Sequence, residues 1–558
     1  MKMLTNHYKF WPRIPTSLTL PQTSLYDNLS VTTKRYPDKT ALIFYGNTIT
    51  YKTLHDEVIA LAGFLQQAFE VQKGEKVLLF MQNSPQFIAA YYAINRADAV
   101  VVPINPMLTA SELEFYIKDC EIQTAIIGQE LYDQVAPLLQ STTLNNLVIA
   151  AYSDYLTANE VIRLPKEVVE PRKGFEGSQH VYWQDAIAAN YVPTAHTVDA
   201  NSLAVIPYTS GTTGLPKGCM HPNKTVQANI LGSFHFSRPT PNTVHLMTLP
   251  LFHVTGMVQS MHTPIYTGST IVIMTRWDRE HALEFIRLYK CTHWVTISTM
   301  LVDFLSNPNL RAEDVASFLS ISGGGATLPE AIGQKLLELT GIRFVEGYGL
   351  SETIAQTHVN PPDRPKLQCL GVPTFDVDSR IIDPATGKEL GANEVGEIVT
   401  HGPQIMTGYY NREEENKHAF IELDGKSFFR TGDIGRYDEE GYFFIVDRVK
   451  RMINASGYKV WPTEIESFLY KHPAVKQACV VGVPDARRGE TVKAFVILQD
   501  EYVGRISEGE IKQWAKEHMA AYKYPRIIEF KQSFPTTSSG KILWRKLQEE
   551  ELSKLENA

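Results

Sequence analysis

The chain has 558 residues, of which 44% are hydrophobic and 20% are charged, and its formal net charge is −8. A chain of this length exceeds what one hydrophobic core supports, so we expect at least two domains. The acidic balance gives no reason to expect a nucleic acid as a partner. No apolar run has the length of a transmembrane segment, and the five dispersed cysteines favour a reducing cytoplasm over a disulfide framework.

The first part of the chain alternates short apolar runs with amphipathic patterns. Apolar runs predict strands at 40–44 and 76–80, and helical spacing predicts helices at 54–69 and 84–96. Apolar strands that alternate with helices are typical of a parallel sheet buried on both faces. The sequence therefore predicts a large α/β domain. The charged, irregular residues 152–182 are instead expected to lie at the surface.

Residues 208–218 read Tyr-Thr-Ser-Gly-Thr-Thr-Gly-Leu-Pro-Lys-Gly and follow the apolar run 203–206. Glycines let backbone N–H groups approach oxyanions, hydroxyls add donors, and a lysine adds a point charge. Lys217 precedes Gly218, whereas the lysine of a Walker A loop follows the last glycine. A run of Gly, Ser and Thr alone is most often a solvated linker. The apolar lead-in and the Pro-Lys-Gly ending favour a phosphate-binding loop.

Three later stretches combine glycines with groups that suit a nucleotide. Residues 319–326 run from a strand into three glycines, whose missing side chains would let a flat ring approach the backbone. Residues 346–353 hold a tyrosine, a serine and a glutamate, which supply a stacking face, a phosphate donor and an oxygen ligand for Mg²⁺. Asp433 follows a glycine in residues 430–433, and a carboxylate there suits the ribose hydroxyls. Alone, that tetrapeptide would be an ordinary turn.

A new pattern begins after residue 447. Clustered basic residues follow, and the spacing then predicts a helix at 464–470 and strands at 477–483 and 492–498. Residues 535–545 close the pattern with a lysine after a Ser/Gly turn. These elements suffice for a small α+β domain.

Taken in order, these stretches resemble the motifs of the adenylate-forming superfamily, which comprises acyl-CoA synthetases, firefly-luciferase-like enzymes and peptide-synthetase adenylation domains. The resemblance spans roughly residues 24–546. It implies a large α/β N-terminal domain, residues 1–447, with parallel sheets covered by helices plus a β-rich subdomain. It further implies a small mobile α+β C-terminal domain, residues 448–558, that turns about a hinge near 447–450.

The resemblance also implies roles for individual residues. The catalytic residues would be Lys217, His253, Glu352 and Lys541, with Mg²⁺ held by Thr209 and Glu352. The ATP-binding residues would be Thr209, Ser210, Gly211, Thr212, Thr213, Gly214, Lys217, Gly325, Ala326, Tyr348, Gly349, Ser351, Asp433, Arg448, Lys450 and Lys541. The path of the acid and CoA would comprise His253, Thr255, Gly325, Ser456, Gly457 and Tyr458. An apolar wall for the acyl chain would come from Phe252, Val254, Met257, Val226, Ile230 and Phe234.

The implied activity is that of an ATP-dependent acid–CoA ligase. It would convert a medium- to long-chain fatty acid to acyl-AMP with release of pyrophosphate, and then transfer the acyl group to CoA. ATP and CoA would be substrates and Mg²⁺ the cofactor, in a cytoplasmic protein that is a possible homodimer. An arylate–CoA (4-coumarate-like) ligase, a fatty acyl-AMP ligase and a nucleotide-binding regulatory protein with a dead site stay open as alternatives. Ser456 stands where luciferase-like relatives carry a lysine, which disfavours luciferase-like oxidation.

Overall fold

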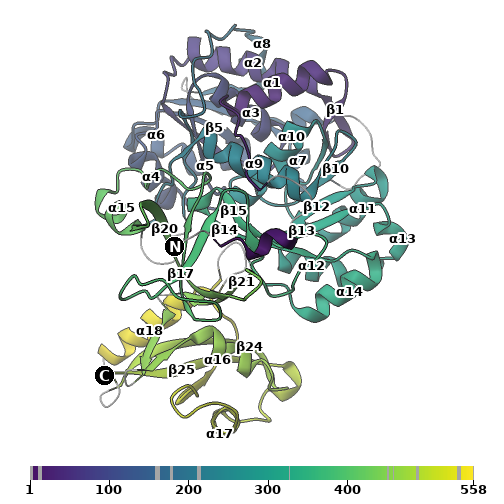
Figure 1. Ribbon diagram of the computed structural model, residues 1–558. Helices are drawn as coiled ribbons and strands as arrows, with labels where there is room; N and C mark the ends of the chain where they lie inside the picture. The colour runs from purple at the N-terminus through teal and green to yellow at the C-terminus, as the bar shows by residue number, and fades with distance from the viewer. Residues whose placement is uncertain are drawn as a thin grey trace. The chain divides into compact units, whose positions relative to one another are not determined.

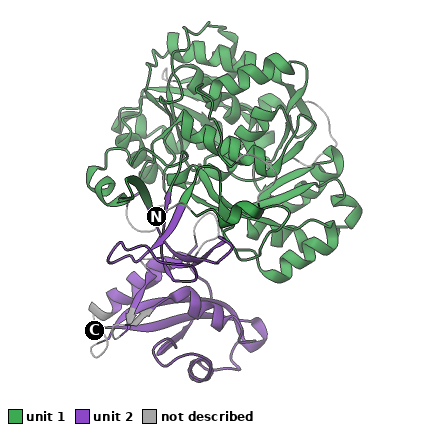
Figure 2. Cartoon of the chain, in the orientation of Figure 1, with its two compact units in different colours: residues 1–209, 216–378, 401–429 green, residues 210–215, 379–400, 430–558 purple. Residues whose placement is uncertain are grey.

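The chain divides into two compact units, which are shown in Figure 2. The computed structural model describes residues 4–10, 16–156, 164–175, 180–209, 215–325, 327–448, 451–455, 458–485, 489–536 and 542–556. Unit 1 comprises mainly residues 1–209, 216–378 and 401–429, and unit 2 mainly residues 379–400 and 430–558. The predicted domain boundary at 447 and 448 stays a prediction.

Unit 1 contains a seven-stranded sheet in the order β7-β6-β5-β3-β4-β8-β9. The pairs from β7 to β8 are parallel, whereas β9 runs antiparallel to β8. The central strands are mostly apolar and almost fully buried, as expected of a sheet covered on both faces. Their bounds are β3 (Lys76–Phe80), β4 (Val100–Pro103), β5 (Thr124–Gly128), β6 (Asn146–Ala150), β7 (His180–Tyr182), β8 (Leu203–Val205) and β9 (His221–Pro222).

A nine-stranded sheet in the order β16-β15-β14-β13-β12-β10-β11-β1-β2 lies in the same unit. Its middle is parallel, and both ends are antiparallel. Of the predicted nucleotide residues, Gly325 directly follows β13, Tyr348 and Gly349 lie in β14, and Ser351 directly follows β14. The strands are β1 (Thr40–Phe44), β2 (Asn47–Thr50), β10 (Val244–Met247), β11 (Thr270–Ile273), β12 (His293–Thr296), β13 (Ser320–Gly324), β14 (Val345–Leu350), β15 (Ala355–Val359) and β16 (Val372–Pro373).

Helices cover these sheets, and α1, α2 and α3 lie side by side in Figure 1. Ser84 caps α3 by accepting a hydrogen bond from the N–H of Phe87, and Thr50 caps α2 in the same way. The helices of unit 1 are η1 (Asn6–Phe10), α1 (Leu25–Arg35), α2 (Tyr51–Gln67), α3 (Pro85–Arg96), α4 (Ala110–Asp119), η2 (Gln129–Leu131), α5 (Tyr132–Val135), α6 (Leu138–Ser141), η3 (Tyr152–Tyr155), α7 (Lys166–Val169), α8 (Trp183–Ala188), α9 (Asn223–Ser237), η4 (Gly256–His262), α10 (Thr263–Thr267), α11 (Arg279–Tyr289), α12 (Ser298–Leu305), α13 (Ala312–Val315), α14 (Glu330–Thr340), η5 (Ser351–Thr353) and α15 (Glu413–Ala419).

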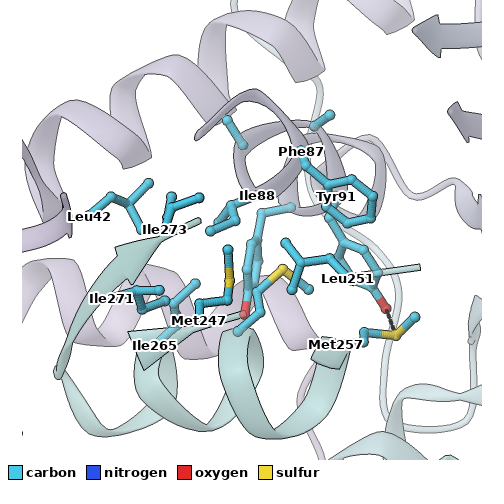
Figure 3. Packing of buried hydrophobic residues seen from close by; sticks show 14 of the residues in the cluster. Leu42, Phe87, Ile88, Tyr91, Met247, Leu251, Met257, Ile265, Ile271 and Ile273 are labelled. Carbon is cyan, nitrogen blue, oxygen red and sulfur yellow. Dashed lines mark hydrogen bonds between the residues drawn. The ribbon is translucent and has the colours of Figure 1, made fainter. Parts of the chain in front are cut away.

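One continuous core joins strands and helices of unit 1. Figure 3 shows Leu42 of β1 and Ile271 and Ile273 of β11 on the same side of the sheet as Ile88 of α3. The hydroxyl of Tyr91 lies 3.5 Å from the sulfur of Met257 in this core. The alternation of apolar runs along the chain therefore predicted a real core, and the predicted α/β fold is confirmed.

The prediction that residues 152–182 form a surface excursion is wrong for part of this segment. Tyr152 is fully buried, and Tyr155 and Val168 are buried as well. Trp183, which follows the segment, donates from its indole N–H to the hydroxyl of Tyr155 at 3.1 Å. The charged residues of this segment predicted exposure. The buried aromatic residues were missed because isolated aromatic residues leave no periodic signal.

Unit 2 is rich in strands. Asp433 on β20 pairs with Arg448 on β21, and in a second sheet β24 pairs antiparallel and β26 parallel with β25. The strands are β17 (Asp378–Ile382), β18 (Gly396–His401), β20 (Lys426–Tyr437), β21 (Phe443–Arg448), β22 (Ile453–Ala455), β23 (Tyr458–Val460), β24 (Val475–Asp485), β25 (Gly489–Leu498) and β26 (Ile527–Phe530), and the helices are α16 (Pro462–Leu469), η7 (Asp500–Tyr502), α17 (Glu508–His518) and α18 (Trp544–Glu556). In unit 1, β19 (Phe420–Leu423) pairs with the first residues of β20. None of the helices in the described ranges is both long and apolar enough to span a bilayer.

Candidate active site

The two ends of the predicted phosphate loop are held together by backbone contacts. Tyr208 and Gly218 form an antiparallel bridge. The N–H of Thr209 donates to the carbonyl of Lys217 at 2.9 Å, and the N–H of Lys217 donates to Oγ1 of Thr209 at 3.2 Å. Ser210, Gly211, Thr212, Thr213 and Gly214 lie outside the described residues. The loop is thus closed at its base by residues on both sides.

A second segment, residues 407–410, lies along the outgoing end of this loop. Cys219 bridges Tyr409, and the N–H of Met220 donates to the carbonyl of Gly408 at 2.9 Å. The N–H of Tyr410 donates to the carbonyl of Gly218 at 2.8 Å. These bonds fix Tyr409 beside Lys217, although the two residues are far apart in the sequence.

Tyr409 connects two of the predicted catalytic residues. The Nζ of Lys217 lies 4.2 Å from the centroid of the Tyr409 ring, which is cation–π distance. The hydroxyl of Tyr409 donates to Oε1 of Glu352 at 2.7 Å. Burial, and secondarily the charge of Glu352, raises the pKa of Tyr409, so the phenol stays a protonated donor. Tyr409 was not among the predicted site residues, because residues 406–410 carry no obvious chemistry in the sequence.

Two contacts shape the turn that contains Glu352. A side chain at Gly349 would collide with the backbone of Ala355, so the turn accepts only glycine there. The carbonyl of Ser351 accepts a hydrogen bond from Nε2 of His221 at 2.8 Å. Burial lowers the pKa of His221 to about 4, so the ring is neutral. His221 therefore supports the turn without adding charge beside Glu352.

The glycines of β13 lie against β14. A Cβ at Gly324 would collide with the carbonyl of Gly347, and Gly325 has a φ of +85°. The Glu346 carboxylate accepts from the N–H of Leu328 at 2.6 Å, which pins the segment after β13 to the start of the next turn. These contacts bring two predicted adenine-site segments together. Ala326 lies outside the described residues, and the ring of Tyr348 lies 5.6 Å from that of His358.

The predicted acyl-site histidine, His253, lies three residues before a π-helix that begins at Gly256. His253 is exposed, and its carbonyl accepts from the N–H of Met257 at 2.9 Å. Thr255 directly precedes the π-helix η4, a rare form that occurs often at functional sites. A side chain at Gly256 would collide with the carbonyl of Pro250, so this glycine permits the tight bend.

The predicted apolar wall is mostly packed core. Val226, Ile230 and Met257 are each 0% exposed and belong to the large core cluster, together with Val254. Phe234 and Phe252 are only half-buried. An apolar helical face cannot be distinguished from a pocket wall by its sequence, because both require the same residue types.

Two of the predicted nucleotide residues of unit 2, Asp433 and Arg448, lie together. Asp433 is 0% exposed, and its Oδ1 lies 2.8 Å from Nε of Arg448. The N–H of Asp433 donates to Oγ1 of Thr431 at 3.1 Å. Tyr458 begins β23. The predictions for Lys450, Ser456, Gly457 and Lys541 fall outside the described residues.

Comparison with known proteins identifies the family. The chain matches the AMP-binding enzyme family over residues 29–410 and the AMP-binding enzyme C-terminal domain over residues 464–541. It is 35% identical to a long-chain-fatty-acid–CoA ligase of Bacillus subtilis (strain 168), over 96% of each chain. It is 30% identical to a feruloyl-CoA synthase of an Amycolatopsis species, over 91% of this chain and 95% of the relative.

A solved structure supports the same assignment. ATP-bound MatB from Rhodopseudomonas palustris superposes with a TM-score of 0.82 at 26% identity, covering 95% of this chain and 99% of MatB. The resemblance inferred from the motifs is thereby confirmed. The chain belongs to the AMP-binding enzyme family.

Proposed function

We propose that this chain is an ATP-dependent fatty-acid–CoA ligase. The observation that carries the proposal is the contact of Tyr409 with both Lys217 and Glu352, which gathers a cation and an anion beside the base of a phosphate-type loop. The ligase names of the relatives and the ATP-bound state of MatB support the same activity.

The proposed reaction has two steps. A carboxylate oxygen of the acid attacks the α-phosphorus of ATP, the bond to the pyrophosphate oxygen breaks, and acyl-AMP forms. The sulfur of CoA then attacks the acyl carbon, the bond to the AMP oxygen breaks, and the thiol proton is lost to solvent. Adenylation is needed because oxide is too poor a leaving group for direct attack by a thiol. Lys217 would neutralise negative charge that develops on the phosphates.

The donor chemistry at the loop fits Mg²⁺. Thr209 offers a hydroxyl oxygen and Glu352 a carboxylate, both hard ligands. In the described ranges no three His, Cys, Asp or Glu side chains gather as a metal cage. Mg²⁺ commonly uses one or two carboxylates plus substrate phosphates, and Glu352 supplies one carboxylate. When bound, the ion would supply charge neutralisation at the phosphates, while Tyr409 orients the carboxylate of Glu352.

We assign the remaining predicted residues to the same reaction. Asp433 would accept hydrogen bonds from the ribose hydroxyls, with Arg448 beside it. Gly325, Tyr348, Gly349 and Ser351 would line the nucleotide turns, and His253 and Thr255 the acid side. Lys541 would contact the α-phosphate in the first step, and the strand that contains Tyr458 would face CoA in the second. The change from the first step to the second would require residues 448–558 to turn about residues 447–450.

An arylate–CoA ligase is the second candidate, because one of the similar relatives carries the name feruloyl-CoA synthase. AMP formation with CoA and a panel of acids separates the two. We expect kcat/KM to rise about fourfold per methylene from short to medium-chain acids, since each buried methylene is worth about 0.8 kcal/mol. A preference for benzoate or ferulate over octanoate would favour the arylate ligase, and no AMP with any acid would reject both.

Location and assembly stay predictions. No disulfide joins the five cysteines, which all lie in the described residues and are buried, and this is compatible with the predicted reducing compartment. Fractionation of cells that express the chain tests the cytoplasmic prediction. Light scattering of the purified protein tests whether it is a homodimer.

A further inference from the structure

We propose that Asp119 is a positioning residue for the phosphate loop. Its carboxylate connects the residue that enters the loop with the segment that carries Tyr409, and so holds Lys217 and Glu352 in register. The inference rests on the proposed function, because the groups that Asp119 would position are those assigned to MgATP.

Asp119 uses one carboxylate oxygen for each side of the site. The hydroxyl of Tyr208 donates to Oδ2 at 2.6 Å, and Nη2 of Arg412 donates to Oδ1 at 2.6 Å. Asp119 is the last residue of α4 and stands far from both partners in the sequence. Only the fold brings the three residues together.

These contacts close a ring around the base of the loop. Tyr208 bridges Gly218, and the carbonyl of Gly218 accepts from the N–H of Tyr410. Arg412, two residues after Tyr410, forms an ion pair with Asp119 and so completes the ring. Tyr409 directly precedes Tyr410 of this ring and contacts Glu352 and Lys217. A displacement of residues 408–412 would therefore move the hydroxyl that holds Glu352.

The burial of this ion pair makes it more than a surface contact. The side chain of Asp119 is 10% exposed and that of Arg412 19% exposed. Such a pair is screened less than an exposed one, and loss of one partner leaves the other charge poorly solvated. The hydroxyl of Tyr208 donates to the same carboxylate. Asp119 therefore accepts hydrogen bonds from both Tyr208 and Arg412.

The chain contains a matched pair with no link to the loop. The hydroxyl of Tyr155 donates to Oε2 of Glu57 at 2.6 Å, and Trp183 donates to the same hydroxyl. This second contact also joins a tyrosine hydroxyl to a carboxyl oxygen at 2.6 Å, yet it belongs to the core under α2. Tyr155→Phe therefore controls for the purely structural effect of losing a buried hydroxyl.

The test separates positioning from stability. Asp119→Asn, Tyr208→Phe and Tyr155→Phe are compared for KM of MgATP, KM of the acid, melting temperature, and the rate of thioester formation from preformed acyl-AMP. For Asp119→Asn and Tyr208→Phe we expect KM of MgATP to rise at least about fivefold, with KM of the acid and the thioester step within about twofold of the parent. For Tyr155→Phe we expect a lower melting temperature with an unchanged KM of MgATP.

Two results would overturn the proposal. One is an unchanged KM of MgATP for both variants at the loop, and the other is an equal loss in both half-reactions. If Asp119→Asn fails to fold, Arg412→Lys tests the same ring, because lysine keeps the charge and loses the planar donor fork. If the parent protein forms no adenylate with any acid, the proposed function fails, and calorimetric titration with MgATP then tests Asp119 by the same fivefold criterion.

Discussion

Two carboxylates that the sequence placed at nucleotide turns stand in opposite surroundings. Glu352, in unit 1, is half-buried and accepts a hydrogen bond from the neutral hydroxyl of Tyr409. Asp433, in unit 2, is fully buried and pairs with the guanidinium of Arg448. A carboxylate beside a neutral donor keeps its full charge for a cation, whereas one beside a guanidinium is already compensated. The surroundings of Glu352 therefore suit a ligand of Mg²⁺, and those of Asp433 suit an acceptor for the uncharged hydroxyls of a ribose.

The largest effect is expected at Glu352. Glu352→Gln keeps the shape and an acceptor for Tyr409 but removes the charge, so adenylation should fall by roughly a hundred- to a thousandfold. The Mg²⁺ concentration needed for half-maximal rate should rise as well. Pyrophosphate release measured against Mg²⁺ checks both, with Glu338→Gln on the exposed face of α14 as the control. An unchanged Mg²⁺ requirement would remove Glu352 from the metal site.

Substitution of Asp433 should raise the KM of ATP and leave the KM of the acid unchanged. Hydrogen bonds to a charged acceptor are worth about 1.5–3 kcal/mol, so Asp433→Ala should raise KM of ATP roughly ten- to a hundredfold. KM of the acid should stay unchanged. Steady-state kinetics with each substrate varied in turn checks the prediction, and equal KM values of ATP for the variant and the parent would refute the ribose assignment.

Tyr409 tests whether the neutral donor matters. Tyr409→Phe keeps the ring that faces Lys217 and removes the hydroxyl that holds Glu352, so adenylation should fall about three- to tenfold. Tyr182→Phe removes a hydroxyl elsewhere in unit 1 and should have no effect. A loss larger than that of Glu352→Gln would contradict the view that Tyr409 acts only by orienting the carboxylate.

The smallest effect concerns pH and His221. Its pKa of about 4 in the folded protein lies below the ordinary value near 6.5, so between these values the unfolded state binds more protons. The contribution of His221 to stability is therefore present above pH 6.5 and is lost as the pH falls toward 4, by at most about 1.4 kcal/mol per pH unit. His221→Asn should flatten the dependence of urea unfolding on pH between 6.5 and 5. Identical slopes in the variant and the parent would contradict the prediction.

The sequence predicted the regular elements well because their periodicity is local. The strands predicted at 40–44 and 76–80 have the observed bounds of β1 and β3, and the helix predicted at 84–96 is α3 with its cap. The order of the motifs also identified the family correctly. Glycine turns and short motifs carry their chemistry within a few residues, which a single sequence displays directly.

What the sequence did not predict depends on contacts between distant segments. The sequence revealed no role for Tyr409 or Asp119, because these roles arise only where residues 407–412 and the end of α4 lie beside the loop. The acyl wall stays a prediction, since the sequence did not show that the apolar face with Val226 and Ile230 packs into the core. Local patterns report the residue type that an environment requires, and tertiary contacts decide which environment it is.

The central claim is that Lys217, Tyr409 and Glu352 form the MgATP site of an enzyme that adenylates an acid. The most direct measurement is the exchange of labelled pyrophosphate into ATP, with and without a fatty acid and Mg²⁺. We predict exchange that requires both the acid and Mg²⁺, that occurs without CoA, and that is nearly lost in Glu352→Gln. Exchange that is independent of the acid, or release of ADP and orthophosphate as the first products, would contradict the claim.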